Sequence, residues 1–293
     1  MATIGTTNES AARLLAGCSL EMTGKDVPAL VEAEGLIPAG TRVNVTFLGN
    51  EDLETRVAAV RAVLERSLLP VPHLSARRLR SAAELDEYLG RLAEVGGAER
   101  VFVVGGDPAA AEGPFDSALD VVRSGALGAH GVREVGVTGY PEGHPDIAED
   151  VLWAALRDKV SEIGAQGLQA SVITQFAFDA DAVVSWIRRA RTEGVNAPVR
   201  VGVPGPAGVK RLLGFARRFG VRSNATIVRK YGFSLTNLMG SAGPDAFVDD
   251  LAARLEAEPG LGEVGLHLYT FGGVATSARW VAERRGATGG DAR

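Results

Sequence analysis

Short apolar runs alternate with longer segments of helical periodicity along the whole chain. Each run of β-branched and other apolar residues predicts a strand, and each is followed by enough chain for a helix. In segments 52–66, 83–95 and 147–165 the apolar residues recur at spacings of three and four, the period of an amphipathic helix. The predicted strands are 18–22, 42–47, 70–75, 100–105, 134–139, 169–175, 198–203 and 264–269.

This alternation predicts an α/β fold with a parallel sheet, because parallel strands are joined by helical crossovers. Eight strand–helix units in about 280 residues favour a (β/α)8 TIM barrel. An open doubly wound sheet is the alternative. We expect a single domain: an N-terminal arm at 1–16, the barrel at 17–285 and a flexible tail at 286–293. Three helical patterns in 204–263 predict extra helices before the last strand.

Composition narrows the function classes. The 293 residues are 46% apolar and 23% charged, with a formal net charge of -5. This acidic balance argues against nucleic acid, which needs a basic face, and there is no polybasic run for anionic lipid. A single cysteine, Cys18, excludes an internal disulfide framework. No membrane span or signal peptide is predicted, so we expect a cytoplasmic protein. A homo-oligomer stays an open alternative.

Polar residues follow the predicted strands where a barrel of this kind builds its active site, at the carboxyl ends. A carboxylate in the buried strand around Glu21 costs several kcal/mol unless it is paired or protonated, so either a catalytic role or a structural ion pair is indicated. Asp107 has a helix-capping alternative, and His73 could be a satisfied half-buried histidine. The full set is Glu21, Thr46, His73, Gly106, Asp107, Tyr140, His144, Gln175 and Tyr269.

Sequence motifs for phosphate, dinucleotide and metal binding are absent from the chain. The segment 202–208 lacks the Gly-Lys-Ser/Thr ending of a phosphate loop, and "VFVVGGDP" lacks the G-x-G-x-x-G dinucleotide fingerprint. The four histidines show no metal-binding spacing, so no metal site is predicted.

The motifs "VVGGDP", "GYPEGHPD", "LRDKV", "ITQFAFD" and "GLHLYTF" occur in an order and spacing that resemble the methylenetetrahydrofolate reductase family. "SLEM", "VNVTFLGN" and "PHLSAR" resemble its first three strands. The resemblance covers roughly residues 17 to 285 and is thin between 205 and 262. "GYPEGHP" together with "ITQFAFD" is its most specific part.

The resemblance implies a barrel that binds FAD at its C-terminal face, where a folate and NADH or NADPH stack alternately against the flavin. The reaction interconverts 5,10-methylenetetrahydrofolate and 5-methyltetrahydrofolate by hydride transfer. Glu21 matches the acid that assists ring opening, and a pKa raised by desolvation would suit that role. Asp107 and Gln175 match groups that hold the pterin and tune the flavin, and Tyr269 is a further substrate contact. The matching flavin contacts are Thr46, His73, Gly106, Asp107, Ala118, Tyr140, His144 and Lys159.

Three departures from the family pattern leave alternatives open. Gly105 replaces an arginine before the Gly-Asp pair, "MTGKD" replaces two prolines, and Gly272-Gly273 replaces an Asn-Arg pair. A flavin-independent version with direct hydride transfer from the nicotinamide is therefore an alternative, as is a catabolic direction. A pterin-dependent methyltransferase and a non-catalytic folate or flavin binder are the alternatives from other classes.

Overall fold

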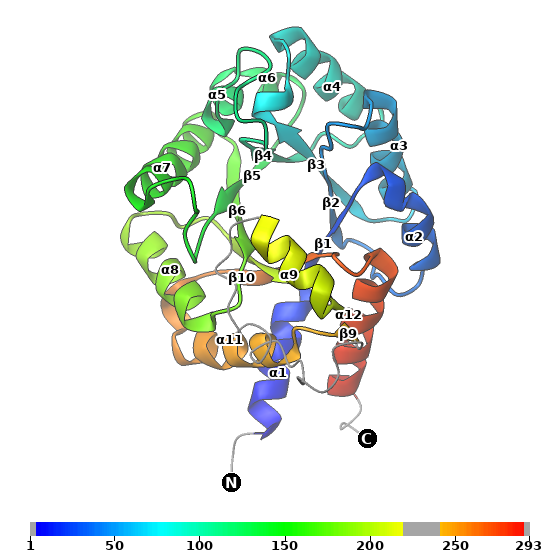
Figure 1. Ribbon diagram of the computed structural model, residues 1–293, viewed down its shortest axis with the longest axis vertical. Coiled ribbons are helices and arrows are strands. Elements are labelled where there is room, and N and C mark those ends of the chain that lie inside the picture. Colours follow the sequence, from blue (N-terminus) through cyan, green and yellow to red (C-terminus); the bar gives the residue numbers. More distant parts are fainter. Residues whose placement is uncertain (1–3, 219–240, 290–293) are drawn as a thin grey trace.

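Eight parallel strands close into a barrel in the computed structural model, which describes residues 4–218 and 241–289 (Figure 1). The order around the barrel is β1-β10-β7-β6-β5-β4-β3-β2. All eight predicted strands are confirmed, and the open-sheet alternative is wrong. The bounds are β1 Ser19–Met22, β2 Arg42–Val45, β3 Leu69–Ser75, β4 Arg100–Val104, β5 Glu134–Gly139, β6 Gln169–Phe176, β7 Val199–Pro204 and β10 Val264–Tyr269.

Helices follow the strands and form the outer ring (Figure 1). Three of them begin at a side chain that accepts from the backbone of the first turn: Asp52 for α3, Ser81 for α4 and Asp179 for α8. The bounds in the ring are α2 Val27–Glu32, α3 Leu53–Leu64, α4 Ala82–Glu94, α5 Ala118–Arg123, α6 Ala126–Ala129, α7 Glu149–Ala165, α8 Ala180–Thr192, α11 Asp245–Ala257 and α12 Val274–Gly289, with short 3-10 turns η1 Gly24–Asp26, η2 Ala76–Arg78 and η3 Pro259–Leu261.

The main hydrophobic core lies between the strands and the helix ring. Alternate strand residues point outward into it, such as Leu20, Val43 and Leu268, each at most 2% exposed. The intervening residues point into the barrel, where polar side chains accompany a small apolar cluster of Val71, Phe102 and Ile173. Because the apolar layer faces the helices, the inner surface of the barrel is available for polar chemistry.

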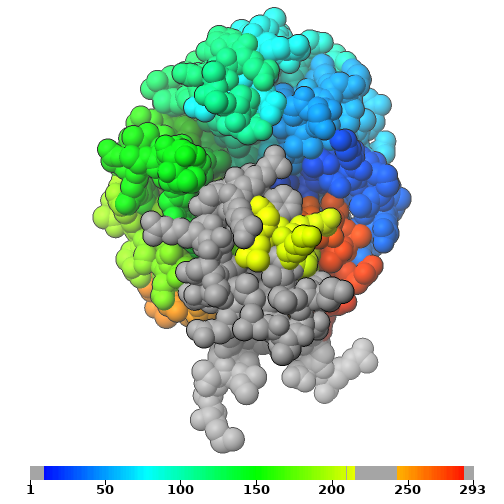
Figure 2. Space-filling model, in the orientation of Figure 1, coloured from blue at the N-terminus to red at the C-terminus, as the bar shows by residue number. Residues whose placement is uncertain are grey.

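Further elements lie before β1 and between β7 and β10, outside the eight strand–helix repeats. Residues 4–16, expected as part of an arm, form helix α1 Ile4–Ala16, which contacts α11, α12 and β10. Two of the three predicted extra helices are confirmed as α9 Val209–Arg218 and α11, and the third, "FSLTNLMG", lies outside the described residues. The short strands β8 Ala207–Gly208 and β9 Ser241–Ala242 pair antiparallel. Helix α9 lies in front of the lower part of the strand ring in Figure 1, and its atoms lie at the front surface of the molecule in Figure 2.

None of the described helices is long and apolar enough to cross a membrane.

Candidate active site

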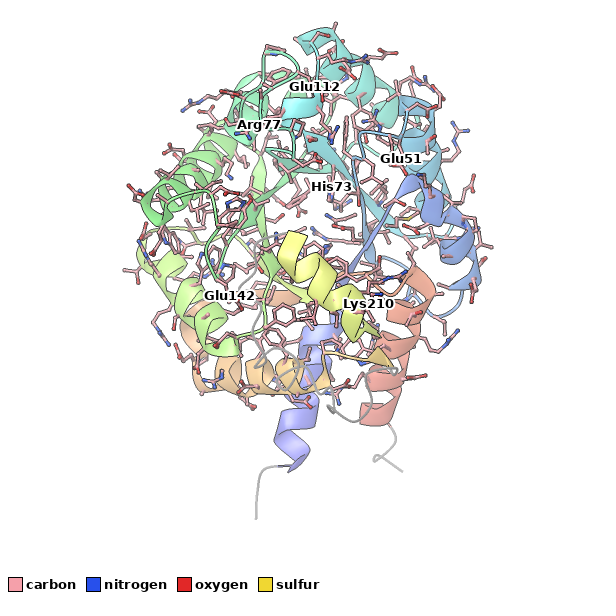
Figure 3. The ribbon with its side chains drawn as sticks, in the orientation of Figure 1. Glu51, His73, Arg77, Glu112, Glu142 and Lys210 are labelled. Carbon is pink, nitrogen blue, oxygen red and sulfur yellow. The ribbon has the colours of Figure 1, made fainter. Side chains whose placement is uncertain are left out.

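Glu21 lies inside the barrel between two buried histidines. Its Oε2 atom is 3.6 Å from Nε2 of His267 on β10 and 4.0 Å from Nε2 of His73 on β3. The Glu21 side chain keeps 21% exposure, whereas those of His267 and His73 keep 1% and 7%. The carboxylate is therefore the solvent-facing member of the cluster, and Figure 3 shows His73 beside β3 in the strand ring.

Neighbouring strands hold both imidazoles in place. His73 Nε2 lies 3.1 Å from the amide nitrogen of Asn44, and the Ser19 hydroxyl lies 2.8 Å from Nδ1 of His267. Parallel register brings Ser19 opposite His267 and Glu21 opposite Asn44. Each ring is thus fixed by one polar partner. A hydrogen bond at one ring nitrogen sets the orientation of the ring and the protonation of the other nitrogen.

The charges in this cluster follow from burial and from contact between the groups. Burial lowers the pKa of His73 to about 4, so this imidazole is neutral at pH 7. Burial alone would raise the pKa of Glu21, but contact with His267 and the neighbouring His73 outweighs it and brings the pKa below its ordinary value. The expectation of a raised Glu21 pKa is wrong for this structure, because the sequence did not reveal the two imidazoles around the carboxyl group.

Gln175 lies in a β-bulge near the end of β6, where the register with β7 shifts between Ile173 and Phe176. Its Oε1 accepts from the backbone N–H of Phe176 at 3.0 Å. No described residue accepts from its amide nitrogen, which leaves a donor for a ligand. The bulge is tied to its neighbours because Thr174 accepts from Gly202 N–H at 2.9 Å. Bulges of this kind re-aim a side chain beside an active site.

An aromatic cluster lies beside the bulge at the same end of the barrel. The hydroxyl of Tyr269 donates to the Thr174 carbonyl at 3.1 Å. The Phe271 ring stacks on Tyr269 with centroids 5.7 Å apart, and Phe176 meets both rings edge-on. These rings give the mouth an apolar wall against which a planar ligand could pack.

Asp107 follows β4 and is held by Arg78 from the turn after β3. Two parallel hydrogen bonds join the guanidinium to the carboxylate, Nε to Oδ1 and Nη2 to Oδ2, each 2.8 Å. Gly106, just before it, has φ +97°, and a Cβ there would meet the Ser75 hydroxyl at 2.4 Å. Glycine is therefore required at 106, and the Asp107 side chain, 66% exposed, stays at the surface of the mouth.

The "GYPEGHPD" loop after β5 is anchored by a residue that the sequence analysis did not select, Glu142. Its Oε1 accepts from the backbone N–H groups of Phe178 and Asp179 at 2.7 and 3.0 Å. Within the loop, the Tyr140 and His144 rings meet edge-on at 5.4 Å, and His144 Nδ1 accepts from the Asp146 N–H. The polar residues of this loop thus fix it to the loop after β6.

Lys159 on α7 is nearly buried, with 7% exposure, and it has no ion pair or hydrogen bond with any described residue. Burial lowers its pKa to about 8. An ammonium group in this state is stabilised by an anionic ligand.

Thr46 and Ala118, two further predicted flavin contacts, occupy structural positions. The Thr46 hydroxyl donates to the Met22 carbonyl at 2.9 Å and joins the ends of β2 and β1. Ala118 is 6% exposed and belongs to the main core.

The glycines that depart from the family pattern have different surroundings. A Cβ on Gly105 would meet no atom within 4 Å, so a side chain fits there. A Cβ on Gly272 would come within 1.8 Å of the Pro206 carbonyl oxygen, and Gly273 has φ +104°. The loop after β10 therefore needs its glycines, whereas position 105 does not.

The sequence analysis missed Ser19, Asn44, Arg78, Glu142 and His267. Strand alternation could have identified two of them, because Ser19 and His267 precede Glu21 and Tyr269 by two positions and so share their face. The contacts of Arg78 and Glu142 depend on loop geometry.

The sequence of the chain is similar to those of known proteins. The family model described as methylenetetrahydrofolate reductase matches residues 25–271. Methylenetetrahydrofolate reductase (NADH) 1 of Arabidopsis thaliana is 25% identical over 203 residues, 60% of this chain and 31% of that protein. Methylenetetrahydrofolate reductase 1 of Schizosaccharomyces pombe is 31% identical over 138 residues, 45% and 22% of the two chains. The matched regions span less than a third of these relatives' lengths.

Among solved structures, an uncharacterised protein from Clostridium thermocellum that binds two copies of 5-methyl-5,6,7,8-tetrahydrofolic acid has the same fold. Its TM-score is 0.60 at 11% identity, covering 94% of this chain and 98% of that one. The family match extends over most of the chain, from the turn after β1 to the loop after β10. The chain belongs to the methylenetetrahydrofolate reductase family.

Proposed function

We propose that this chain interconverts 5,10-methylenetetrahydrofolate and 5-methyltetrahydrofolate by hydride transfer, with a nicotinamide nucleotide as the other substrate. The observation that carries the proposal is Glu21, a carboxylate at the barrel mouth within 4.0 Å of two buried imidazoles. A family relative from Arabidopsis thaliana carries NADH in its name, which favours NADH as the co-substrate. The protein from Clostridium thermocellum that binds 5-methyl-5,6,7,8-tetrahydrofolic acid shares the fold and supports a folate as the substrate.

Glu21 is the proposed acid–base group toward the folate. A methylene bridge between two amines opens only when the leaving nitrogen is protonated, and a positioned acid supplies that proton. Contact with His267 keeps Glu21 ionised in the free chain. A bound folate would exclude water from the mouth, which shifts the Glu21 pKa upward and favours proton uptake. The carboxylate would also stabilise the cation produced by ring opening.

Asp107 and Gln175 are the proposed pterin-holding groups. The Gln175 amide nitrogen is an available donor in a fixed bulge, and the Asp107 carboxylate is oriented by Arg78. Tyr269 and Phe271 would form the apolar wall beside the ring system.

FAD is the proposed cofactor, and a buried lysine on α7 fits its charge. The buried ammonium of Lys159 lacks an anionic partner among the described residues, as a phosphate-binding lysine would before its ligand arrives. Tyr140 and His144, held by the Glu142-anchored loop, would line the same arm of the cofactor. Bound flavin would accept hydride from the nicotinamide and pass it to the folate.

A flavin-independent reaction is the second candidate. It is favoured by Gly105, Gly272 and Gly273, which lack the side chains of the arginine and the Asn-Arg pair in the family pattern. The roles of Thr46, His73, Gly106 and Ala118 toward a flavin stay predictions, as do the cytoplasmic location and the domain division.

The test uses the purified full chain. The absorbance of any flavin released on denaturation is measured first, and then NADH and NADPH oxidation with 5,10-methylenetetrahydrofolate, with and without added FAD. We expect folate-dependent oxidation of NADH that requires FAD. Turnover with no flavin bound or required would establish the flavin-independent version. The absence of any folate-dependent oxidation, and of the reverse reaction from 5-methyltetrahydrofolate, would refute the proposal.

A further inference from the structure

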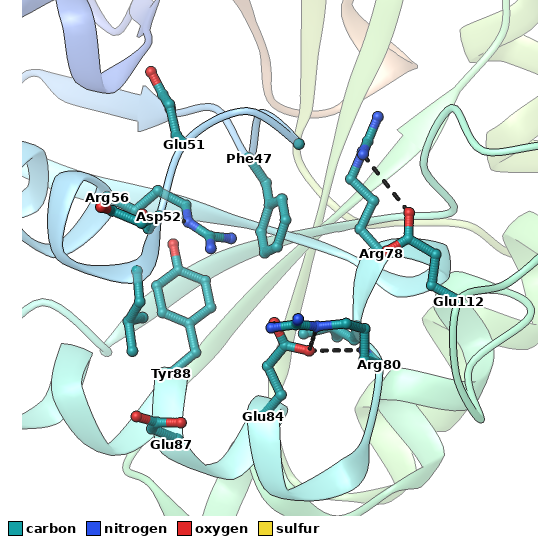
Figure 4. A pocket seen from close by; sticks show the side chains of 13 residues that line it. Phe47, Glu51, Asp52, Arg56, Arg78, Arg80, Glu84, Glu87, Tyr88 and Glu112 are labelled. Carbon is teal, nitrogen blue, oxygen red and sulfur yellow. Dashed lines mark hydrogen bonds and ion pairs between the residues drawn. The ribbon is translucent and has the colours of Figure 1, made fainter.

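Arg78 lies at the barrel mouth, between the loops that follow β2, β3 and β4. It is the last residue of η2, and its Nε and Nη2 atoms donate to the two oxygens of Asp107 in the loop after β4. Its third nitrogen, Nη1, lies 3.8 Å from Oε1 of Glu112, a contact that Figure 4 shows as a dashed line. The Arg78 side chain is 22% exposed, so two acids hold a guanidinium that is close to solvent.

Glycine at position 49, in the loop after β2, makes room for this guanidinium. A Cβ on Gly49 would lie 1.9 Å from Nη1 and 2.5 Å from Cζ of Arg78. The three atoms nearest to that Cβ all belong to the Arg78 guanidinium, which is the far end of a flexible side chain. Alanine at 49 would therefore displace the guanidinium and leave the backbone in place, so Arg78 can be moved off Asp107 without changing any charge.

The pair between Arg78 and Asp107 has the geometry that a pterin would need at the same carboxylate. A carboxylate accepts a planar fork of two N–H donors with one lone pair from each oxygen, and these two lone pairs serve one fork at a time. The amino-pyrimidinone edge of a pterin presents such a fork, made of N3–H and the 2-amino group. Arg78 holds the two oxygens in this manner, at 2.8 Å each. The guanidinium and the pterin edge are therefore alternative ligands of Asp107.

Space and a second acid are available to Arg78 when it leaves Asp107. Arg78 and Glu112 both line a cavity of about 380 Å³ beside α3 and α4 (Figure 4). Because Nη1 already lies 3.8 Å from Glu112, a rotation of the side chain exchanges the pair with Asp107 for a pair with Glu112. The Asp107 side chain is 66% exposed, and an ion pair this exposed is weak enough for a ligand to displace.

We propose that Arg78 competes with the folate for Asp107 and so sets the affinity and the selectivity of the pterin site. In the free chain the guanidinium occupies both carboxylate oxygens, and a bound pterin edge displaces it toward Glu112. A ligand that lacks the two-donor edge does not displace Arg78 and is bound without the help of Asp107. The inference rests on the proposed function, because it takes the substrate to be a folate whose pterin is held by Asp107.

The test compares Gly49→Ala and Arg78→Gln with the parent chain in calorimetric titrations with 5-methyltetrahydrofolate, with FAD present throughout. Competition predicts about fivefold tighter binding in both variants, because more chains then have an Asp107 carboxylate that can accept the pterin. If Arg78 only orients Asp107 for the ligand, both substitutions weaken binding instead. Arg80→Gln is the matched control that should bind as the parent does, since the partner of this exposed arginine is Glu84 (Figure 4).

A second ligand separates competition for the carboxylate from a general opening of the mouth. It is 5-methyltetrahydrofolate with a methyl group in place of the 2-amino group, so its pterin edge has lost one of the two donors. This ligand does not need both oxygens of Asp107, and its affinity should be nearly the same in Gly49→Ala and in the parent. An equal gain for the two ligands would overturn the proposal, because Gly49→Ala would then act by widening the mouth.

Turnover is measured on the same samples, so failure of this inference can be told from failure of the proposed function. Tighter binding in Gly49→Ala, without turnover by any sample, supports the role of Arg78 and refutes the proposed reaction. Turnover by the parent, with unchanged or weaker binding in Gly49→Ala, refutes the role of Arg78 alone, and binding by none of the chains refutes both. Where the two variants differ, or where Arg78→Gln does not fold, Gly49→Ala decides, because it keeps the positive charge that attracts the carboxylates of the folate.

Discussion

Replacement of Glu21 by glutamine tests the proposed acid directly. The amide has nearly the same shape as the carboxyl group, and the contacts of Glu21 with His267 and His73 are 3.6 and 4.0 Å, longer than hydrogen bonds. His73 is neutral at pH 7, because its pKa is about 4, so its pair with Glu21 gives little Coulomb stabilisation, and the contact with His267, which lowers the Glu21 pKa, is the main one that the amide weakens. We therefore expect the free energy of unfolding to change by about 1 kcal/mol or less.

The catalytic loss should be much larger than the loss of stability. A general acid contributes about 10² to 10⁴ in rate, which corresponds to roughly 3 to 5 kcal/mol of transition-state stabilisation. Oxidation of the nicotinamide needs no proton at the folate nitrogen. We expect Glu21→Gln to lose folate turnover in that range and to retain nicotinamide oxidation in the half-reaction with the flavin.

Stopped-flow measurement of the two half-reactions, with urea unfolding alongside, separates the outcomes. Glu34→Gln is the matched control, an exposed glutamate in the turn after α2 that should behave as the parent chain does. If Glu21→Gln reduces the folate as fast as the parent, the acid assignment is wrong and moves to Asp107. If both half-reactions and the unfolding free energy fall together, Glu21 is a structural ion pair.

Three further predictions concern His73, Glu142 and the glycines at 105 and 106. The pKa of His73 is about 4 in the folded chain against an ordinary 6.5, so the unfolded chain takes up a proton first as pH falls. Urea unfolding should therefore show about 2 kcal/mol less stability at about pH 5 than at pH 7. His73→Gln should reduce this dependence of stability on pH. Glu142→Ala should lower the unfolding free energy by about 2 kcal/mol, because two backbone N–H groups lose their acceptor, and Glu142→Gln should recover most of it; equal losses in the two variants would contradict this. Gly105→Arg should fold normally and bind FAD more tightly in a fluorescence titration, and a loss of stability in this variant would contradict the open space at 105. Gly106→Ala should lower the free energy of unfolding by about 1 to 3 kcal/mol.

The barrel was predictable because its information is local. Apolar alternation and helical spacing are set by which residues must face the core, and strands such as 134–139 and 264–269 were located to the residue. Eight strand–helix units of this length are typical of a closed (β/α)8 barrel, so their number favoured the closed sheet. Glu21, Asp107, Tyr140, Gln175 and Tyr269 were placed at one end of the barrel for the same reason, since parallel strands all end there.

The environments of these residues were not predictable. The sequence indicated a buried carboxyl group at Glu21 and hence a raised pKa, but register across β1 and β10 brings His267 against it and reverses the direction. Charge and pKa depend on neighbours within a few ångströms that are far apart along the chain, here 246 positions for Glu21 and His267.

Loop contacts and the surroundings of buried polar atoms between α3 and α4 were decided by tertiary structure alone. The "GYPEGHPD" loop was recognised as unusual, but its anchor, Glu142, reaches backbone N–H groups whose position depends on how β5 and β6 end. Arg56 and Tyr88 have the spacing of ordinary helix residues on α3 and α4, and their unpartnered atoms exist only because the two helices pack side by side. Periodicity determines which face of a helix is buried, whereas the packing of one face on another determines which polar atoms are left without a partner.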